Sequence, residues 1–235
     1  MTNLMTNQPT QSYKILGKFV VGSRLHSLHN QYSDWDYRGV HISSLKSILS
    51  PFAKNKNTVW IEGDEDNTSY ELIDFCKLAV VGNPSILEVL FSNQIKEITP
   101  EMEELRANRH KFLDSSKIFE ACKGYAHNQY NKMNLFEPDK RTPKFAVAYL
   151  RTLWQTEALL RIGELPCQIT GEAREFLYKV KYYDYTNFGD LIPELVRLFS
   201  QYQIKLAEAY QQNHNKFSPD IEWIEEFIER SYAQK

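Results

Sequence analysis

The stretch from residue 18 to residue 36 constrains this chain more than any other part of its sequence. Residues 18–21 have the composition of a buried strand, and they lead directly into Gly22-Ser23. Glycine lets the backbone approach a ligand closely, and a helix that begins there directs free N–H groups at an anion. Further on, Asp34 and Asp36 have the i, i+2 spacing that puts both carboxylates on one face of an extended segment. This order predicts a phosphate-binding turn beside a carboxylate pair that can hold Mg²⁺ together with substrate phosphates.

Each half of this pattern is common on its own, since most Gly-Ser pairs after a strand are turns and most isolated Asp-x-Asp pairs are solvated. The combination is more specific. A strand, Gly-Ser, a short polar segment and a second strand that opens with Asp-x-Asp resemble the DNA polymerase β superfamily of nucleotidyltransferases. The strings Gly22-Ser23-Arg24 and Ser33-Asp34-Trp35-Asp36-Tyr37-Arg38-Gly39 are similar to one branch of it, the stand-alone nucleotidyltransferases that include RNA-repair-associated members.

The resemblance extends over residues 14–165. Residues 66–72 are similar to the segment with the family's third carboxylate, and residues 82–91 closely match its Gly-Asn-Pro…Leu-Glu helix. Gly124-Tyr125-Ala126 and the spaced Lys144, Arg151 and Gly163 are similar to its helical second half. The chain departs from the pattern at Ser27, where relatives commonly carry glycine. This departure concerns the shape of the phosphate loop.

The resemblance implies metal-dependent transfer of a nucleoside monophosphate from an NTP to a hydroxyl acceptor, with an RNA end as one candidate. Two Mg²⁺ or Mn²⁺ ions are implied as cofactors, because two-metal sites stabilise both the attacking and the leaving oxygens of such a displacement. Asp34 and Asp36 are the expected metal ligands, and the resemblance gives Asp66 as the third. The same acidic stretch also offers Glu62, Asp64, Glu65 and Glu71 for the third role.

Several polar residues are candidates for binding the triphosphate. Gly22 and Ser23 are expected to contact the β- and γ-phosphates, and Arg24 is a phosphate partner because its fork matches phosphate oxygens. Arg38 shares a strand face with Asp36, so it either meets the triphosphate or acceptor or pairs with the aspartates.

The helical second half adds further candidates. Lys144 and Arg151 are two helical turns apart and share a face, which the resemblance places toward the nucleotide; a solvated helix face is the alternative. Lys123, His127 and Tyr130 also share a helix face and are expected to contact acceptor or base, or to lie in a core or at the surface. His26 and His29 flank the phosphate turn, where they either touch substrate or lie at the surface.

The predicted fold class is α+β, with a small mixed sheet over residues 1–100 and a helical region over residues 101–235 that packs on it and binds nucleotide or acceptor. Strands are expected at 13–21, 37–43 and 58–62, followed by an acidic turn over 63–67. Helices are expected at 69–81 and 84–91, then at 101–112, 117–133, 144–162, 171–182 and 188–213, with a last one after Ser218.

Composition narrows the class of partner. The net charge of −2 argues against broad nonspecific binding to nucleic acid, but residues 117–151 hold seven basic against three acidic side chains. An RNA or DNA acceptor is expected to lie along that segment.

No apolar run is long enough to span a membrane, and the first ten residues, expected to be a frayed tail, lack the features of a signal peptide. Cys76, Cys122 and Cys167 lie in apolar helical patterns, which favours reduced thiols, rather than a zinc site, in a cytoplasmic protein.

Other interpretations stay open. The chain either is an active nucleotidyltransferase or is a catalytically inactive module of the same fold that binds nucleotide or nucleic acid. The intact Asp34 and Asp36 pair favours the active enzyme. Its acceptor is RNA, DNA, a protein hydroxyl or a small molecule, and no pattern predicts the preferred NTP or an oligomeric state. A dehydrogenase is disfavoured because no Gly-x-Gly-x-x-Gly follows the first strand.

Overall fold

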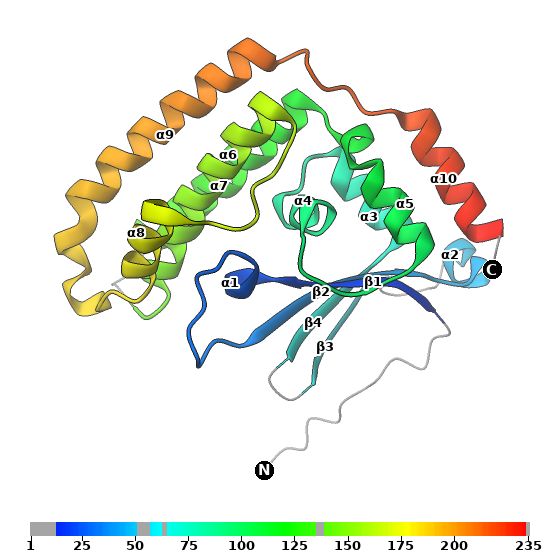
Figure 1. Cartoon of the computed structure of the whole chain (residues 1–235), viewed down its shortest axis with the longest axis horizontal. Helices are drawn as coiled ribbons and strands as arrows, with labels where there is room; N and C mark the ends of the chain where they lie inside the picture. Colours follow the sequence, from blue (N-terminus) through cyan, green and yellow to red (C-terminus); the bar gives the residue numbers. More distant parts are fainter. Residues whose placement is uncertain (1–12, 51–56, 63–64, 135–138, 234–235) are drawn as a thin grey trace.

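The computed structural model describes residues 13–50, 57–62, 65–134 and 139–233. The tail expected over the first ten residues, the metal-ligand alternative Asp64 and the acidic residue Glu137 lie outside the described residues. The predicted α+β class is confirmed, because a mixed sheet occupies the N-terminal half and helices make up the rest of the described chain (Figure 1).

The sheet has the strand order β3-β4-β2-β1-β5 among the described residues. Its strands are β1 (Lys14–Val21), β2 (Trp35–Ile42), β3 (Thr58–Glu62), β4 (Glu65–Glu71) and β5 (Ile95–Ile98). β1 pairs antiparallel with β2 and β5, β3 pairs antiparallel with β4, and β2 runs parallel to β4. The parallel pair lies at the centre of the site described below.

Strand β4 corrects two expectations from the sequence. Residues 65–67 of the acidic turn expected over 63–67 belong to β4, while residues 63 and 64 lie outside the described residues. The start of a helix at Ser69 is wrong, since β4 continues to Glu71 and helix α3 begins only at Leu72. The inward-facing side chains of β4, Asn67, Ser69 and Glu71, are polar, so the strand lacks the usual apolar alternation. They are buried with hydrogen-bond partners: Ser69 contacts His41, and Glu71 accepts from the backbone of Ile73.

Three helices lie on one side of the sheet in Figure 1: α3 (Leu72–Val80), α4 (Pro84–Phe91) and α5 (Pro100–Ala107). The helix expected at 101–112 is divided, because α5 ends before Asn108 and a short 3₁₀ turn, Arg109–Phe112, follows. Strand β5 and the short helix α2 (Leu45–Leu49) are absent from the expected elements; both are short, and β5 is a largely exposed edge strand. A four-residue helix, α1 (Gly22–Leu25), follows β1 directly.

The helical half contains α6 (Ser115–Asn134), α7 (Thr142–Ile162), α8 (Gly171–Lys181), α9 (Ile192–Asn213) and α10 (Ile221–Ala233). Helix α7 is central to it and packs against α6, α8 and α9. A 3₁₀ stretch, Tyr185–Leu191, replaces the beginning of the helix expected from residue 188. Within the described residues no helix combines the length and apolar character needed to cross a membrane.

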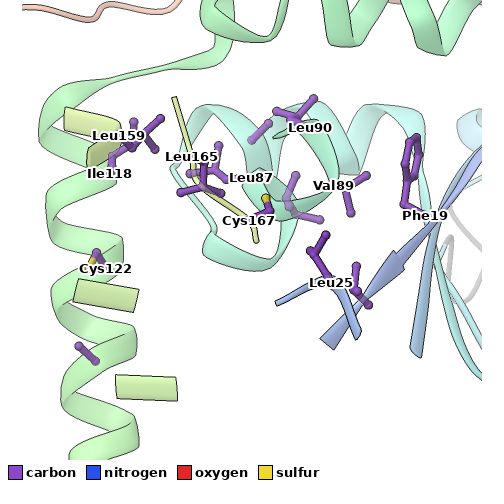
Figure 2. Packing of buried hydrophobic residues seen from close by; sticks show 14 of the residues in the cluster. Phe19, Leu25, Leu87, Val89, Leu90, Ile118, Cys122, Leu159, Leu165 and Cys167 are labelled. Atoms are coloured by element: carbon purple, nitrogen blue, oxygen red, sulfur yellow. The ribbon is translucent and has the colours of Figure 1, made fainter. Parts of the chain in front are cut away.

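Helix α4 joins the two halves. Its residues Leu87, Val89 and Leu90 lie between Phe19 and Leu25 of the sheet half and the α6 residues Ile118 and Cys122 (Figure 2). One hydrophobic cluster therefore runs through both halves, and the boundary near residue 100 stays a prediction. The three cysteines are buried and form no disulfide.

Candidate functional site

The turn after β1 is built around the close approach of Gly22 and Asp36. Gly22 has φ +65°, in the left-handed region that favours glycine. A Cβ at this position would lie 2.2 Å from Oδ2 of Asp36, so only a residue without a side chain fits. Antiparallel pairing of Val21 with Asp36 brings the two segments together. The Gly22-Ser23 turn and the second carboxylate of the predicted pair are thus packed against each other.

Asp36 and Asp66 lie side by side. They are directly paired in the parallel register of β2 and β4, so their side chains share a face of the sheet. Burial, followed by the charges of Asp66 and Asp34, raises the pKa of Asp36. Asp34 precedes the first residue of β2 and is exposed. The structure therefore brings the three predicted carboxylates within electrostatic range of one another.

Two of the alternatives for the third carboxylate are engaged elsewhere. Glu65 forms an ion pair with Lys18 at 3.0 Å, and Glu71 is buried as the N-cap of α3, where Tyr232 also donates to it. The backbone of Glu62, the last residue of β3, is paired with Glu65. Asp66 is the acidic residue of this stretch that lies opposite Asp36.

A polar cavity of about 240 Å³ opens over Asp36 and Asp66, and we call it the aspartate cavity. Its walls include Gly22, Asp36, Asp66, Arg38, Tyr125 and Arg151. The Nε atom of Arg38 is buried there without a hydrogen-bond partner in the described part of the chain. Arg38 thus faces the same space as the aspartates, and its charge opposes the upward pKa shift of Asp36.

The residues around the aspartates suit a cation that takes its other ligands from a substrate. In the described ranges no group of three or more His, Cys, Asp or Glu side chains is arranged to hold a metal ion. Mg²⁺ usually binds through one or two carboxylates plus substrate phosphates and water, which is what Asp36 and Asp66 beside an open polar cavity can offer. Unpaired carboxylates held together in this way also favour a cation electrostatically.

A second cavity, of about 380 Å³, is lined by Ser23 of the Gly22-Ser23 turn, and we call it the lysine cavity. It is lined by Ser23, Asp34, Lys144, Arg151, Lys181 and Tyr182 among others. Ser23, Lys144 and Arg151 were expected near the nucleotide, and the structure brings them to one space. Lys181 and Tyr182 come from the end of α8 and its following residue; sequence reasoning missed both, because no local pattern links them to a turn so much earlier in the chain.

Arg24 is directed at the protein itself. Its guanidinium donates to the backbone carbonyls of Ser33 at 2.6 Å and Asp34 at 3.1 Å, and it lies 3.9 Å from the centroid of the Trp35 ring. These interactions fix the chain immediately before β2. In this arrangement Arg24 holds the segment that carries Asp34.

Arg151 is tied to the sheet half through Glu88 of α4. Its Nη1 atom lies 2.5 Å from Oε1 of Glu88 and 2.8 Å from Oε1 of Gln155. Burial opposes ionisation of Glu88, but Arg151 and then His26 outweigh it and hold the pKa of Glu88 well below its usual range. Glu88 is a lone acid in the apolar run of α4, and such an acid needs a buried partner. That requirement was the available sequence clue to this pair.

His26 is buried rather than at the surface. Its Nδ1 donates to the carbonyl of Cys167 at 2.7 Å, and its Nε2 lies 3.4 Å from Glu88. Burial, followed by the charge of Arg151, lowers the pKa of His26. His29, in contrast, is exposed. His26 and Arg151 both line the lysine cavity and the aspartate cavity.

Asn83 and Pro84 have structural roles. Asn83 caps α4 by accepting from the backbone N–H groups of Ser85 and Ile86, and Pro84 occupies the first turn. Gly82 precedes them with φ +72°, and a Cβ there would lie 2.8 Å from the backbone of Ile118. The Gly-Asn-Pro motif therefore places α4 against α6.

Lys123, His127 and Tyr130 do share one face, as predicted. They line a third cavity, of about 590 Å³, between α6, α7 and α9, together with Tyr149 and Phe199. None of the three lines the aspartate cavity. The α6 residue that lines it is Tyr125. The sequence had indicated Tyr125 only as part of a motif, without a role.

A known protein family matches the chain over almost its whole length. The sequence model of a family described as the RNA repair pathway DNA polymerase beta family (RlaP) matches residues 1–234. No curated protein matches the chain. The match extends well beyond the residues that carried the resemblance and includes the helical half with Lys181. The chain therefore belongs to the RNA repair pathway DNA polymerase beta family.

Proposed function

We propose that this chain is a metal-dependent nucleotidyltransferase that transfers a nucleoside monophosphate from an NTP to a hydroxyl acceptor, and that the acceptor is an RNA end. The observation that carries the proposal is the register of β2 and β4. It holds Asp36 beside Asp66 and against the Gly22-Ser23 turn, at the junction of a polar and a cationic cavity. The family's RNA repair description favours RNA over the other acceptors.

The residues of the chain have separable tasks in this reaction. Ser23, Lys144 and Arg151 bind the triphosphate, while Arg24 holds Asp34 in place through the backbone of Ser33 and Asp34. Asp36 and Asp66, with Asp34 nearby, would hold Mg²⁺ or Mn²⁺ together with the substrate phosphates, and the metal would neutralise charge on the attacking and leaving oxygens. Arg38 and Tyr125 face the acceptor in the aspartate cavity. Positioning and charge stabilisation of this kind supply most of the catalysis in phosphoryl-group chemistry.

The test is transfer of label from each of the four NTPs to defined acceptors. The full chain is incubated with Mg²⁺ or Mn²⁺ and with RNA, DNA or protein, and the labelled product is identified. We expect label on RNA, at its end, and loss of labelling when the metal is chelated.

The matched variants are Asp66→Asn and Asp190→Asn. Asp190 is exposed in the 3₁₀ stretch that follows α8 and lines neither cavity, so its variant controls for a general loss of one negative charge. Labelling that survives in Asp66→Asn would remove Asp66 from the site. Labelling of protein instead of RNA would identify a protein-nucleotidylating enzyme, and nucleotide binding without labelling would identify an inactive binding module.

A further inference from the structure

Lys181 is a half-buried cation in the lysine cavity whose position is set by the backbone of the phosphate loop. It lies at the last position of α8, and its Nζ donates to the carbonyl of Leu28 at 2.8 Å. Tyr182 donates to the same carbonyl at 3.1 Å, and Arg174, two turns earlier on α8, donates to the carbonyl of Ser27 at 2.7 Å. Helix α8 therefore clamps the loop that follows Gly22-Ser23.

The charge of Lys181 is poorly compensated by the protein. Burial, followed by the neighbouring charge of Lys144, lowers the pKa of Lys181 to about 8, and Asp36 only partly offsets these effects. Lys144 and Lys181 face one space, and Asp34 is the carboxylate in the wall of that cavity. Arg151, which also lines it, is already paired with Glu88. Holding like charges together in a partly desolvated space is unfavourable unless an anion joins them.

The arrangement also gives the direction in which a triphosphate would lie. Gly22 touches Asp36, while the next residue, Ser23, lines the lysine cavity. A triphosphate whose reacting phosphate lies beside Asp36 and Asp66 would extend past Ser23, and its terminal phosphate would reach Lys144 and Lys181. Lysine is suited to that position because it binds phosphate as a compact point charge.

We propose that Lys181, together with Lys144, binds the terminal phosphate and makes the site selective for nucleoside triphosphates over monophosphates. This inference rests on the proposed function and deepens it. Lys181, at the end of α8 in the helical half, is then a specificity-determining residue. Helix α8 also connects phosphate binding to the loop at Ser27 and Leu28 through its hydrogen bonds to their carbonyls.

The test is calorimetric titration of the full chain with ATP, AMP and inorganic tripolyphosphate, without acceptor. Lys181→Met and Lys144→Met should each weaken ATP and tripolyphosphate binding roughly tenfold to a hundredfold, the range for hydrogen bonds to charged groups, and leave AMP binding unchanged. Lys179→Met is the matched control, since Lys179 is an exposed lysine on the same helix. Lys181→Arg should retain most of the affinity.

The outcomes separate this inference from the proposed function. If wild type transfers label and Lys181→Met binds ATP as tightly as wild type, the role of Lys181 is overturned while the proposed function stands. The same holds if Lys181→Met loses ATP and AMP binding equally. If wild type binds neither ATP nor tripolyphosphate, both proposals fail. Should Lys181→Met not fold without its hydrogen bond to Leu28, Lys144→Met decides the matter, because Lys144 is exposed and lies outside the clamp that α8 forms on the loop.

Discussion

The carboxylate of Asp36 lies against Gly22 in a partly buried position, and burial together with the charges of Asp66 and Asp34 raises its pKa. A raised pKa means that the folded chain binds this proton more tightly than the unfolded chain. The folded state is therefore favoured below the unfolded pKa, and that contribution is lost as pH rises through the folded pKa. At neutral pH the ionised group lowers stability.

Asp36→Asn should therefore abolish nucleotidyl transfer while the melting temperature at pH 7 stays equal or rises. We expect activity to fall at least about a hundredfold, the scale for loss of one electrostatic stabiliser. Labelled-NTP assays and thermal unfolding measure the two effects, with Asp190→Asn as the control. Near-full activity in the variant would remove Asp36 from the metal site.

Ser27 is the one non-glycine residue of the described chain with positive φ, at +60°. The resemblance to the polymerase β superfamily predicts a glycine at this position. Ser27→Gly should stabilise the protein by about 0.5–1 kcal/mol, since relief of the left-handed strain exceeds the entropy that glycine adds to the unfolded chain. Denaturant unfolding measures the gain. Ser27→Ala keeps the Cβ and should bring none; a similar gain in both variants would point to the hydroxyl instead.

At the scale of elements, helix α4 depends on its cap. Asn83 accepts from Ser85 at 3.0 Å and from Ile86 at 3.3 Å. Asn83→Ala should lower the free energy of unfolding by about 1 kcal/mol, and Asn83→Ser should restore most of the loss. Equal stability of the alanine and serine variants would show that the cap contributes little.

The elements also show what the sequence can and cannot predict. The strand before Gly22, the cap and proline of α4 and the carboxylate pair at the start of β2 follow local rules, and each is found where expected. Strand β4 was misread because its inward side chains are polar, and only pairing with β2 and β3 makes it a strand. Lys181 was missed because its interactions with a distant segment leave no local pattern. The lone acid Glu88 indicates that a buried partner is needed, but no local pattern identifies that partner as Arg151.

At the scale of the whole molecule, the Glu88–Arg151 pair links α4 of the sheet half to α7 of the helical half. Glu88→Gln should lower stability by about 3 kcal/mol, because it leaves the buried guanidinium without its counter-charge. The double variant Glu88→Leu/Arg151→Met removes both charges and should be less destabilised. A larger destabilisation in the double variant would show that packing rather than charge makes this pair important.

The same pair predicts a pH effect. The pKa of Glu88 is held below its usual value in the folded chain. The ionised carboxylate therefore stabilises the folded state above the unfolded pKa of glutamate, and this contribution is lost as pH falls from that value toward the folded pKa. Wild type should lose stability more steeply than Glu88→Gln on acidification, which unfolding curves below pH 5 measure.

The prediction that an RNA acceptor lies along the basic segment 117–151 can be tested through the salt dependence of RNA binding. Lys123, Lys132 and Lys140 are all exposed. If RNA lies along this segment, replacing all three with methionine should weaken RNA binding and reduce the slope of log K against log salt by about 0.7 for each phosphate that the variant no longer neutralises. A matched triple at Lys46, Lys96 and Lys179 should have no such effect. A steep slope unchanged by the first triple would place the RNA on another surface.

Arg151 and His26 belong to the walls of both the lysine cavity and the aspartate cavity. Under the proposed function the nucleotide and the acceptor would therefore share two wall residues, and we expect the binding of one to change the affinity for the other. Thermodynamic linkage requires such an influence to be mutual, so the factor by which the nucleotide changes the affinity of the acceptor must equal the factor by which the acceptor changes the affinity of the nucleotide.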